Sequence, residues 1–268
     1  MERFTPIKRI LVTGASGQLG LSIQDIAMEY PQLVFVFANS EALDITDYVQ
    51  VDKIIENGNF DYCINCAAYT NVEHAEKSPE MAFKVNAEAV KHLALACKQY
   101  GVTLIHISTD YVFDGEKGSP YTVDDQPNPI NMYGKSKWEG EKYIQEILDK
   151  YFIVRTSWLY HKKHGNNFYK TILKKAKKGE VLRITDEQIG CPTNAANLAK
   201  FLLKHILTEN QEYGIYHFTD GQVMSWYGFA QNILKENGLK STTNIVKENN
   251  YRSFAKRPKN SILKKILI

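Results

Sequence analysis

The chain has 268 residues, of which 44% are hydrophobic and 24% charged, a composition typical of a globular protein with a sizeable core. No run of about 18 apolar residues occurs, which excludes a membrane-spanning helix, and the opening residues lack an apolar run of signal-peptide length, so we expect a cytoplasmic protein. Residues 1–130 hold 9 Lys/Arg against 18 Asp/Glu, whereas residues 131–268 hold 24 against 12. A basic second half suits an anionic ligand, but nucleic-acid binding is not expected, because the net charge is only +3 and no recognised module is present.

The first 160 residues alternate between short apolar runs and helical patterns. Helices are predicted over 18–30, 47–58 and 78–101, and around Tyr133. Strands are predicted at RILVTG (9–14), LVFVFA (33–38), YCINCAA (62–68), VTLIHIS (102–108) and YFIVRTSWLY (151–160). This alternation predicts an α/β fold of the Rossmann type, with helices on both faces of a doubly wound parallel sheet.

The second half is less regular. Helical patterns cover 167–179, 194–207 and 225–238, with short strand-like pieces at 181–185 and 215–219. We expect residues 1–160 to form a dinucleotide-binding domain, to which segments near 194–218 return. Residues 161–268 would then form mainly a smaller substrate-binding domain.

The four cysteines are predicted to be free. Cys63 and Cys66 stand three apart in an apparent strand and should therefore face opposite sides of the sheet, which suits neither a redox pair nor a zinc site. We expect both of them, with Cys97 and Cys191, to be small core residues.

Three glycines follow the first predicted strand and open a helix. In VTGASGQLG, Gly14 would allow a tight turn, Gly17 a close approach of the backbone to a pyrophosphate, and Gly20 close packing of helix and sheet. The free N–H groups of the helix N-terminus attract phosphate. The spacing predicts NAD(P) binding; the alternative is a purely structural turn.

The end of the second predicted strand bears on the choice of cofactor. An acid there would bind the ribose of NADH, and an arginine would favour NADPH. Asn39 and Ser40 occupy the position instead, so NADPH and NADH both remain open. Asp44, five residues after Asn39, is a candidate to bond the adenine.

Tyr133 and Lys137 stand one helical turn apart in NMYGKSKWEGEK. An ammonium beside a phenol should lower its pKa from about 10 and make it a better acid near neutrality. Upstream, HISTDYVF ends the fourth predicted strand with Thr109 and Asp110, where α/β sheets bind their ligands. The order of these elements favours a catalytic site; the alternative is a solvated helix face.

Several longer segments resemble the dTDP-4-dehydrorhamnose reductases, a branch of the extended short-chain dehydrogenase/reductase family. They include GASGQLG, NCAAYTNVEHAE, STDYVFDG, YGKSKWEGE, RTSWLY, EQIGCPT and RPKNSIL, and they span nearly the whole chain. The resemblance implies NAD(P)H-dependent reduction of the C4 ketone of dTDP-4-dehydro-6-deoxy-L-mannose, giving dTDP-L-rhamnose.

The resemblance also implies roles for individual residues. Tyr133 would protonate the C4 oxygen, Lys137 would hold the nicotinamide ribose, and Asn86 would position a water behind the lysine. Other expected cofactor contacts are Gly17, Gln18 and Leu19 at the pyrophosphate, Asp44 and Ile45 at the adenine, and Ala68, Tyr69 and Thr70 along the cleft. Thr109, Asp110, Trp158 and Arg257 would contact the substrate.

Two positions depart from the family pattern. Some members bind a divalent cation at a dimer interface through acids that correspond to Ser22 and Ala196 here, so we expect no metal and either a monomer or a weak homodimer. Alternatives are a reductase or epimerase for another nucleotide 4-keto-6-deoxy sugar, or a non-catalytic NADP-binding regulatory subunit like that of methionine adenosyltransferase.

Overall fold

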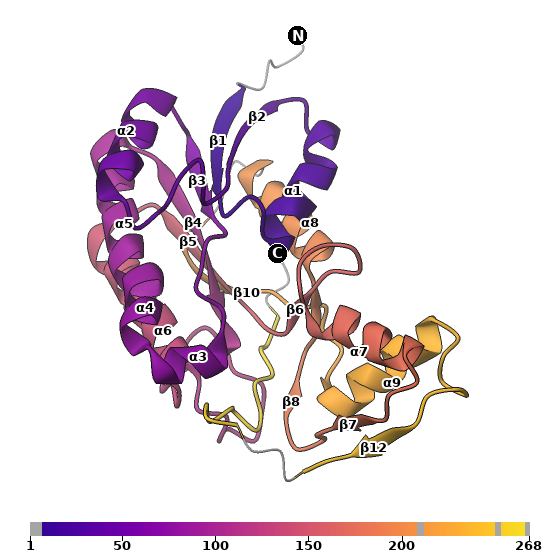
Figure 1. Ribbon diagram of the computed structural model, residues 1–268. Coiled ribbons are helices and arrows are strands. Elements are labelled where there is room, and N and C mark those ends of the chain that lie inside the picture. Colours follow the sequence, from indigo (N-terminus) through magenta and orange to yellow (C-terminus); the bar gives the residue numbers. More distant parts are fainter. Residues whose placement is uncertain (1–6, 208–211, 250–252, 266–268) are drawn as a thin grey trace.

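A parallel sheet of six strands forms the centre of the computed structural model, which describes residues 7–207, 212–249 and 253–265 (Figure 1). The strands lie in the order β10-β5-β4-β3-β1-β2. Their bounds are β1 Lys8–Thr13, β2 Leu33–Ala38, β3 Tyr62–Asn65, β4 Thr103–Thr109, β5 Tyr151–Thr156 and β10 Gly214–His217. The strand order reverses at β1, which pairs with both β2 and β3. Ligands of doubly wound sheets bind at such a reversal, beyond the carboxyl ends of the strands.

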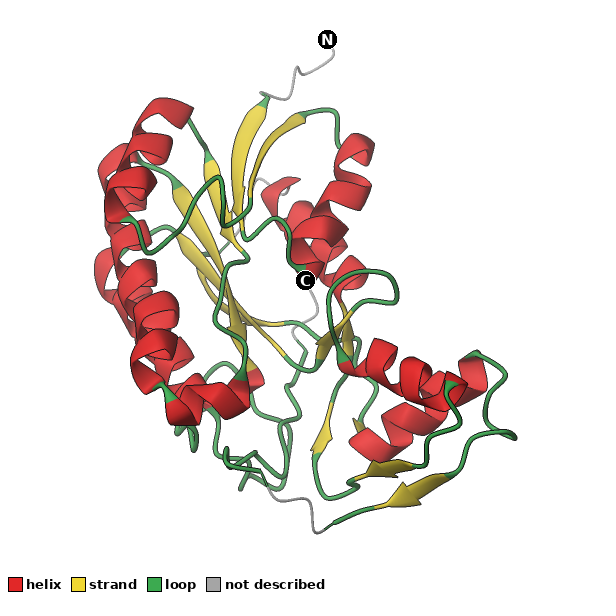
Figure 2. Ribbon diagram, in the orientation of Figure 1, coloured by secondary structure: helices red, strands yellow, loops and turns green. Residues whose placement is uncertain are grey.

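Helices cover both faces of this sheet, so the Rossmann-type prediction is confirmed (Figure 2). One face carries α2 (Tyr48–Gly58), α3 (Val72–Lys77), α4 (Pro79–Phe83), α5 (Ala89–Tyr100) and α6 (Met132–Ile147). The other carries α1 (Gln18–Ile26), the short η1 (Ala27–Glu29) and α8 (Ala195–Leu207).

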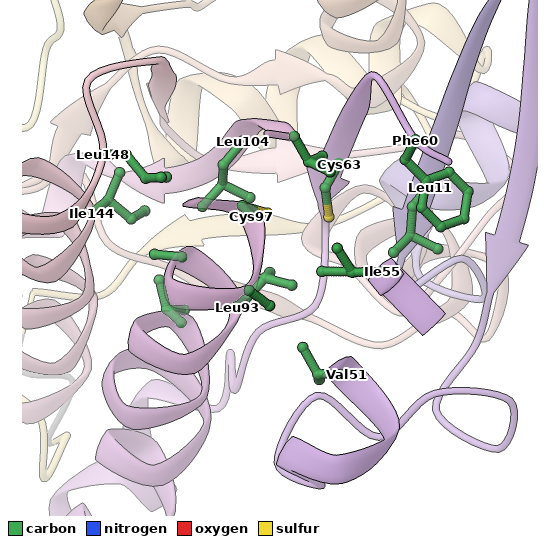
Figure 3. Packing of buried hydrophobic residues seen from close by; sticks show 14 of the residues in the cluster. Leu11, Val51, Ile55, Phe60, Cys63, Leu93, Cys97, Leu104, Ile144 and Leu148 are labelled. Atoms are coloured by element: carbon green, nitrogen blue, oxygen red, sulfur yellow. The ribbon is translucent and has the colours of Figure 1, made fainter. Parts of the chain in front are cut away.

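Alternate residues of each strand enter different apolar layers, as the two-residue period of a strand requires. Leu11 packs with Leu93 and Ile144 beneath α2, α5 and α6 (Figure 3), whereas Ile10 packs with Ile23 and Leu198 beneath α1 and α8. Cysteines follow the same rule. Cys63 and Cys97 lie in the first layer, while Cys66 borders the second.

Six further elements form a smaller layer of their own beside the sheet (Figure 1). They are α7 (Phe168–Lys177), β7 (Leu182–Ile184), β8 (Ile189–Gly190), β11 (Met224–Ser225), α9 (Trp226–Glu236) and β12 (Ile245–Lys247). Tyr169 and Ile172 of α7 pack there against Phe229 and Ile233 of α9. The later elements α8 and β10 instead join the main sheet layer. The predicted division of function between residues 1–160 and 161–268 stays a prediction.

Two predicted elements are interrupted in the structure. The apolar run 151–160 contains two strands, because Trp158 adopts a left-handed φ of 47° and ends the ladder before β6 (Leu159–Tyr160), which pairs with β9 (Thr193–Asn194). The predicted helix 78–101 contains a π-turn, η2 (Lys84–Glu88), between α4 and α5. Within the described ranges, no helix is both long and apolar enough to cross a bilayer.

Glycines let α6 pack unusually close to its neighbours. A Cβ atom on Gly140 would lie 2.2 Å from the carbonyl oxygen of Asn86 in the π-turn, and one on Gly134 would lie 2.1 Å from that of Tyr111. Both contacts are with backbone, which cannot rotate away. The glycines in YGKSKWEGE therefore set the depth at which α6 lies.

We expect Gly140→Ala to lower the free energy of unfolding by about 1–3 kcal/mol, because the overpacking outweighs the helix propensity gained, about 1 kcal/mol. Gly228→Ala in α9 is the matched control, since a Cβ there meets only ordinary contacts at 3.5 Å and beyond. Urea unfolding of both variants measures the difference. Equal midpoints for the two would contradict the close packing of α6.

Candidate active site

A cavity of about 610 Å³ lies at the carboxyl ends of the central strands. Its wall combines the loop after β1, the segment after β3, the end of β4, the first turns of α6 and residues of the smaller layer. Among the predicted site residues, those that line it are Gly17, Gln18, Leu19, Ala68, Thr70, Thr109, Asp110, Tyr133, Lys137 and Trp158. The structure therefore brings most of the predicted catalytic and binding residues to one cavity.

The glycine loop has the shape that phosphate binding requires. Gly14 takes a left-handed φ of 61°, and a Cβ there would lie 2.6 Å from the backbone nitrogen of Ala67. A Cβ on Gly20 would lie 2.6 Å from Ala15 Cα, so α1 packs directly on the loop. Gly17 caps α1 without a side chain, which leaves the first N–H groups of the helix without a side-chain acceptor. The residues present thus fit a dinucleotide pyrophosphate.

Gln18 connects the glycine loop to the segment after β5. Its Nε2 donates to the carbonyl of Leu159 at 3.1 Å, and its Oε1 accepts from Nδ2 of Asn167 at 3.2 Å. Asn167 also caps α7 through its Oδ1. The amide side chain of Gln18 thereby ties the smaller layer to the glycine loop.

The predicted adenine contacts lie outside the cavity lining. Asn39 Oδ1 accepts the N–H of Ala42 at 2.9 Å, and Asp44 accepts both the N–H and the hydroxyl of Thr46. Ile45 is buried, and the phenol of Tyr69 contacts the imidazole of His74. The cofactor roles of these residues stay predictions.

Thr109, Asp110 and Tyr133 meet at the end of β4. The Thr109 hydroxyl donates to Oδ1 of Asp110 at 3.0 Å, and Thr109 is close enough to Tyr133 to lower the pKa of its phenol. Burial raises the pKa of Asp110 from 3.8 to about 7, against the lowering effect of hydrogen bonds from Ser261 and Thr109. Its Oδ2 is buried without a partner among the described residues. Asp110 lines the cavity, so its carboxyl group is a candidate acceptor for a polar ligand.

Burial also raises the pKa of Tyr133, to about 12, although the contact with Thr109 lowers it. The expected lowering by Lys137 is not seen in this geometry. Lys137 is buried, and its Nζ donates to the carbonyl of Ile107 at 2.7 Å and lies 3.0 Å from Nε2 of His106. Burial lowers the pKa of Lys137 to about 8. Tyr133 is therefore a protonated phenol throughout the physiological range.

His106 was not among the predicted site residues. Its one signal in the sequence is that it is the only ionisable residue in the apolar run VTLIHIS, and such a residue in a buried strand requires a polar partner. That partner is Lys137, from a helix 31 positions away in the chain.

Asn86 and Arg257 lie outside the cavity lining. Asn86 Nδ2 donates to the hydroxyl of Ser136 and to the carbonyl of Tyr69, while its Oδ1 accepts the N–H of Tyr69. Arg257 is paired with Glu73 at 2.8 Å. The predicted water behind the lysine and the predicted diphosphate contact stay predictions.

Trp158 forms a wall of the cavity together with Trp226. Their rings stack with centroids 3.7 Å apart and planes 7° apart. A bulky residue with positive φ is a strained conformation that usually marks a functional position. A Cβ on Gly190 would lie 2.6 Å from the Trp158 ring, so that glycine makes room for the indole. Cys66 also lines the cavity, on the opposite side of the sheet from Cys63, and is thus less enclosed than we expected.

Comparison with known proteins agrees with this geometry. Residues 8–267 match the family model for the RmlD substrate binding domain. The chain is 39% identical over 265 residues to dTDP-4-dehydrorhamnose reductase of Aggregatibacter actinomycetemcomitans, covering 95% of this chain and 90% of the relative. It is 35% identical over 257 residues to the spore coat polysaccharide biosynthesis protein SpsK of Bacillus subtilis, covering 95% and 88%.

Solved structures of similar proteins have the same fold. The crystal structure of dTDP-4-dehydrorhamnose reductase from Bacillus anthracis, in complex with NADP, matches with a TM-score of 0.90 at 39% identity and covers 97% of this chain and 91% of its own. UDP-glucose 4-epimerase of Thermus thermophilus, at 20% identity and a TM-score of 0.79, shares the fold. The resemblance seen in the sequence motifs is confirmed, and the chain belongs to the RmlD substrate binding domain family, that of the dTDP-4-dehydrorhamnose reductases.

Proposed function

We propose that this protein uses NADPH or NADH to reduce the C4 ketone of a dTDP-4-dehydro-6-deoxy sugar, forming dTDP-L-rhamnose in the cytoplasm. The observation that supports this most directly is the meeting of Thr109, Tyr133 and Lys137 with the loop Gly17–Gln18–Leu19 in one cavity. A bound nicotinamide cofactor supplies hydride chemistry. The relatives named as dTDP-4-dehydrorhamnose reductases support the choice of substrate.

The residues of the chain divide the remaining work between them. Tyr133 donates its phenolic proton to the C4 oxygen, because an acid with a pKa of about 12 stays protonated until a developing alkoxide demands the proton. Thr109 turns its single hydroxyl proton from Oδ1 of Asp110 to the same oxygen. The carboxyl group of Asp110, which lines the cavity, accepts a sugar hydroxyl. The Trp158–Trp226 stack excludes water from one side.

We expect Tyr133→Phe to lower kcat by about 10²- to 10⁴-fold and to leave cofactor Kd almost unchanged, because the proton donor is lost while the ring volume is kept. Thr109→Val should cost less, since the proton donor remains. Tyr143→Phe, the same change on α6 away from the cavity, is the control and should keep wild-type turnover. Steady-state NADPH oxidation with the dTDP-ketosugar measures all three. Undiminished turnover by Tyr133→Phe would show that the phenol is not the proton donor, whereas no turnover by the wild-type protein would favour a binding-only regulatory protein.

NADPH and NADH should bind within about tenfold of each other, or about 1.4 kcal/mol. Asn39 is neutral, so it neither repels a 2′-phosphate nor pairs with it. Asn39→Asp should weaken NADPH binding by about tenfold or more, because a carboxylate would face that phosphate, and should weaken NADH binding less. Fluorescence titration of both cofactors is the test. A hundredfold preference in the wild-type protein would contradict the assignment of Asn39.

Asp110→Asn should stabilise the free protein above pH 7 while it reduces turnover. The raised pKa means that the folded state holds a proton that the unfolded chain releases above pH 3.8, so wild-type stability falls as pH rises from about 4 to about 7. Three pKa units correspond to about 4 kcal/mol, and an unpartnered amide offsets about 1–3 of these. We therefore expect a gain of about 1–3 kcal/mol at pH 8 and a loss of about 1–3 kcal/mol near pH 4, measured by urea unfolding. An equal effect at both pH values would contradict the raised pKa.

A further inference from the structure

Four buried polar side chains form a chain of hydrogen bonds that ends at Lys137. The Thr13 hydroxyl lies 2.6 Å from Oδ1 of Asn65, Nδ2 of Asn65 lies 3.1 Å from Nδ1 of His106, and Nε2 of His106 lies 3.0 Å from Lys137 Nζ. The residues come from β1, β3, β4 and α6, and each is at most 1% exposed. The series therefore runs from Thr13 at the centre of the sheet to Lys137 at the cavity.

The direction of the protons in this series is set at Asn65. The backbone N–H of Ala67 points at one side-chain atom of Asn65 from 3.2 Å, and an N–H can only donate, so that atom must be the carbonyl oxygen. Nδ2 of Asn65 then faces His106 and donates to its Nδ1. Since a neutral imidazole carries a single proton, the proton of His106 must lie on Nε2.

That tautomer presents a donor to Lys137. A neutral amine at Lys137 satisfies every group, because it accepts from His106 Nε2–H and donates to the carbonyl of Ile107. An ammonium instead faces a donor with a donor. With the proton on Nδ1 of His106 instead, the ring would point a donor at Nδ2 of Asn65. With the Asn65 amide turned over, Nδ2 would instead face the N–H of Ala67. Either change leaves a buried donor unmatched, which costs about 1–3 kcal/mol.

We propose that His106 is a positioning residue for Lys137, held by Asn65 in the Nε2–H tautomer so that it stabilises the neutral amine. The inference rests on the reductase function proposed above and on the role that the family resemblance implies for Lys137, which is to hold the cofactor ribose. Its consequence is that the lysine changes charge close to physiological pH. The ammonium is the form that supports the alkoxide at C4, so turnover falls as pH rises through the titration of Lys137.

The surrounding charges agree with this arrangement. On α6 itself, Tyr133 is protonated, and Glu141 raises the pKa of Lys137 but is paired with Arg155 of β5 at 2.7 Å. From β4, His106 is kept neutral, because burial and the neighbouring Lys137 lower its pKa well below its usual value. Asp110, after β4, acts on Tyr133. Glu141 therefore opposes the shift of Lys137 only in part, since its charge is shared with Arg155.

The first test reads the tautomer directly in the cofactor-free protein. Long-range ¹H–¹⁵N correlation spectra of ¹⁵N-histidine protein, with the His106 signals assigned by their loss in His106→Gln, should show the Nε2–H tautomer without titration between pH 6 and 9. A proton on Nδ1, or an imidazolium in that range, overturns the proposal.

The second test moves the charge of Lys137. His106→Gln adds no charge and can turn its amide oxygen toward the ammonium, so the Nζ titration of Lys137 should move up by about one pH unit or more, and the alkaline fall of kcat with it. Cofactor Kd at pH 7 should stay within about threefold. Asn65→Asp keeps an acceptor for the N–H of Ala67 but replaces the donor that faces His106 with a second acceptor. The proton of His106 should then move to Nδ1, and the pH at which Lys137 titrates should rise, as in His106→Gln.

The outcomes separate this inference from the proposed function. If the Lys137 titration stays at its wild-type pH in His106→Gln, His106 does not set the charge and the inference fails, whatever the turnover. If the spectra and the titration behave as expected but no dTDP-ketosugar is reduced, the hydrogen-bond series stands and the proposed reaction is wrong. The wild-type spectrum and His106→Gln decide the matter if Asn65→Asp does not fold.

Discussion

The structure depends on the burial of polar groups along helix α6. This helix places Ser136, Lys137 and Glu141 against the sheet, where water cannot reach them, so each needs a partner from another element. Glu141 accepts three hydrogen bonds from Arg155 on β5, two from its Nε and one from its Nη2. A buried ion pair contributes little net stability against an apolar alternative, but losing one partner costs about 3–5 kcal/mol. The partners of Ser136, Lys137 and Glu141 therefore help to specify the depth and rotation of α6.

The arrangement of side chains around the cavity follows from that placement. With Gly134 and Gly140 close to neighbouring backbone, the first turns of α6 reach the end of β4, and Tyr133 meets Thr109 there. The π-turn lies opposite Gly140 and contains Asn86. The side chain of Asn86 is buried there and bonds to Tyr69 and to Ser136 of α6. Irregular helix turns of this kind are common beside functional sites.

The cavity also depends on contacts between distant segments. Gln18 in the glycine loop bonds to Leu159 and Asn167. The strained turn at Trp158 directs its indole toward Trp226. These contacts join residues about 70 to 150 positions apart. Local sequence patterns do not encode them, which explains why the run 151–160 was predicted as one strand and is two.

The sequence by itself determined the sheet, the glycine loop and the pairing of Tyr133 with Lys137 on one helix. Apolar period, turn glycines and helical spacing are local properties, and Gly14, Tyr133 and Lys137 could be assigned from them. Only the tertiary structure decided what surrounds those residues. It showed that burial raises the pKa of Tyr133 instead of leaving Lys137 to lower it, and that Lys137 turns toward His106. Burial and hydrogen-bond direction depend on elements that are distant in the chain and adjacent in space, so no local pattern in the sequence contains them.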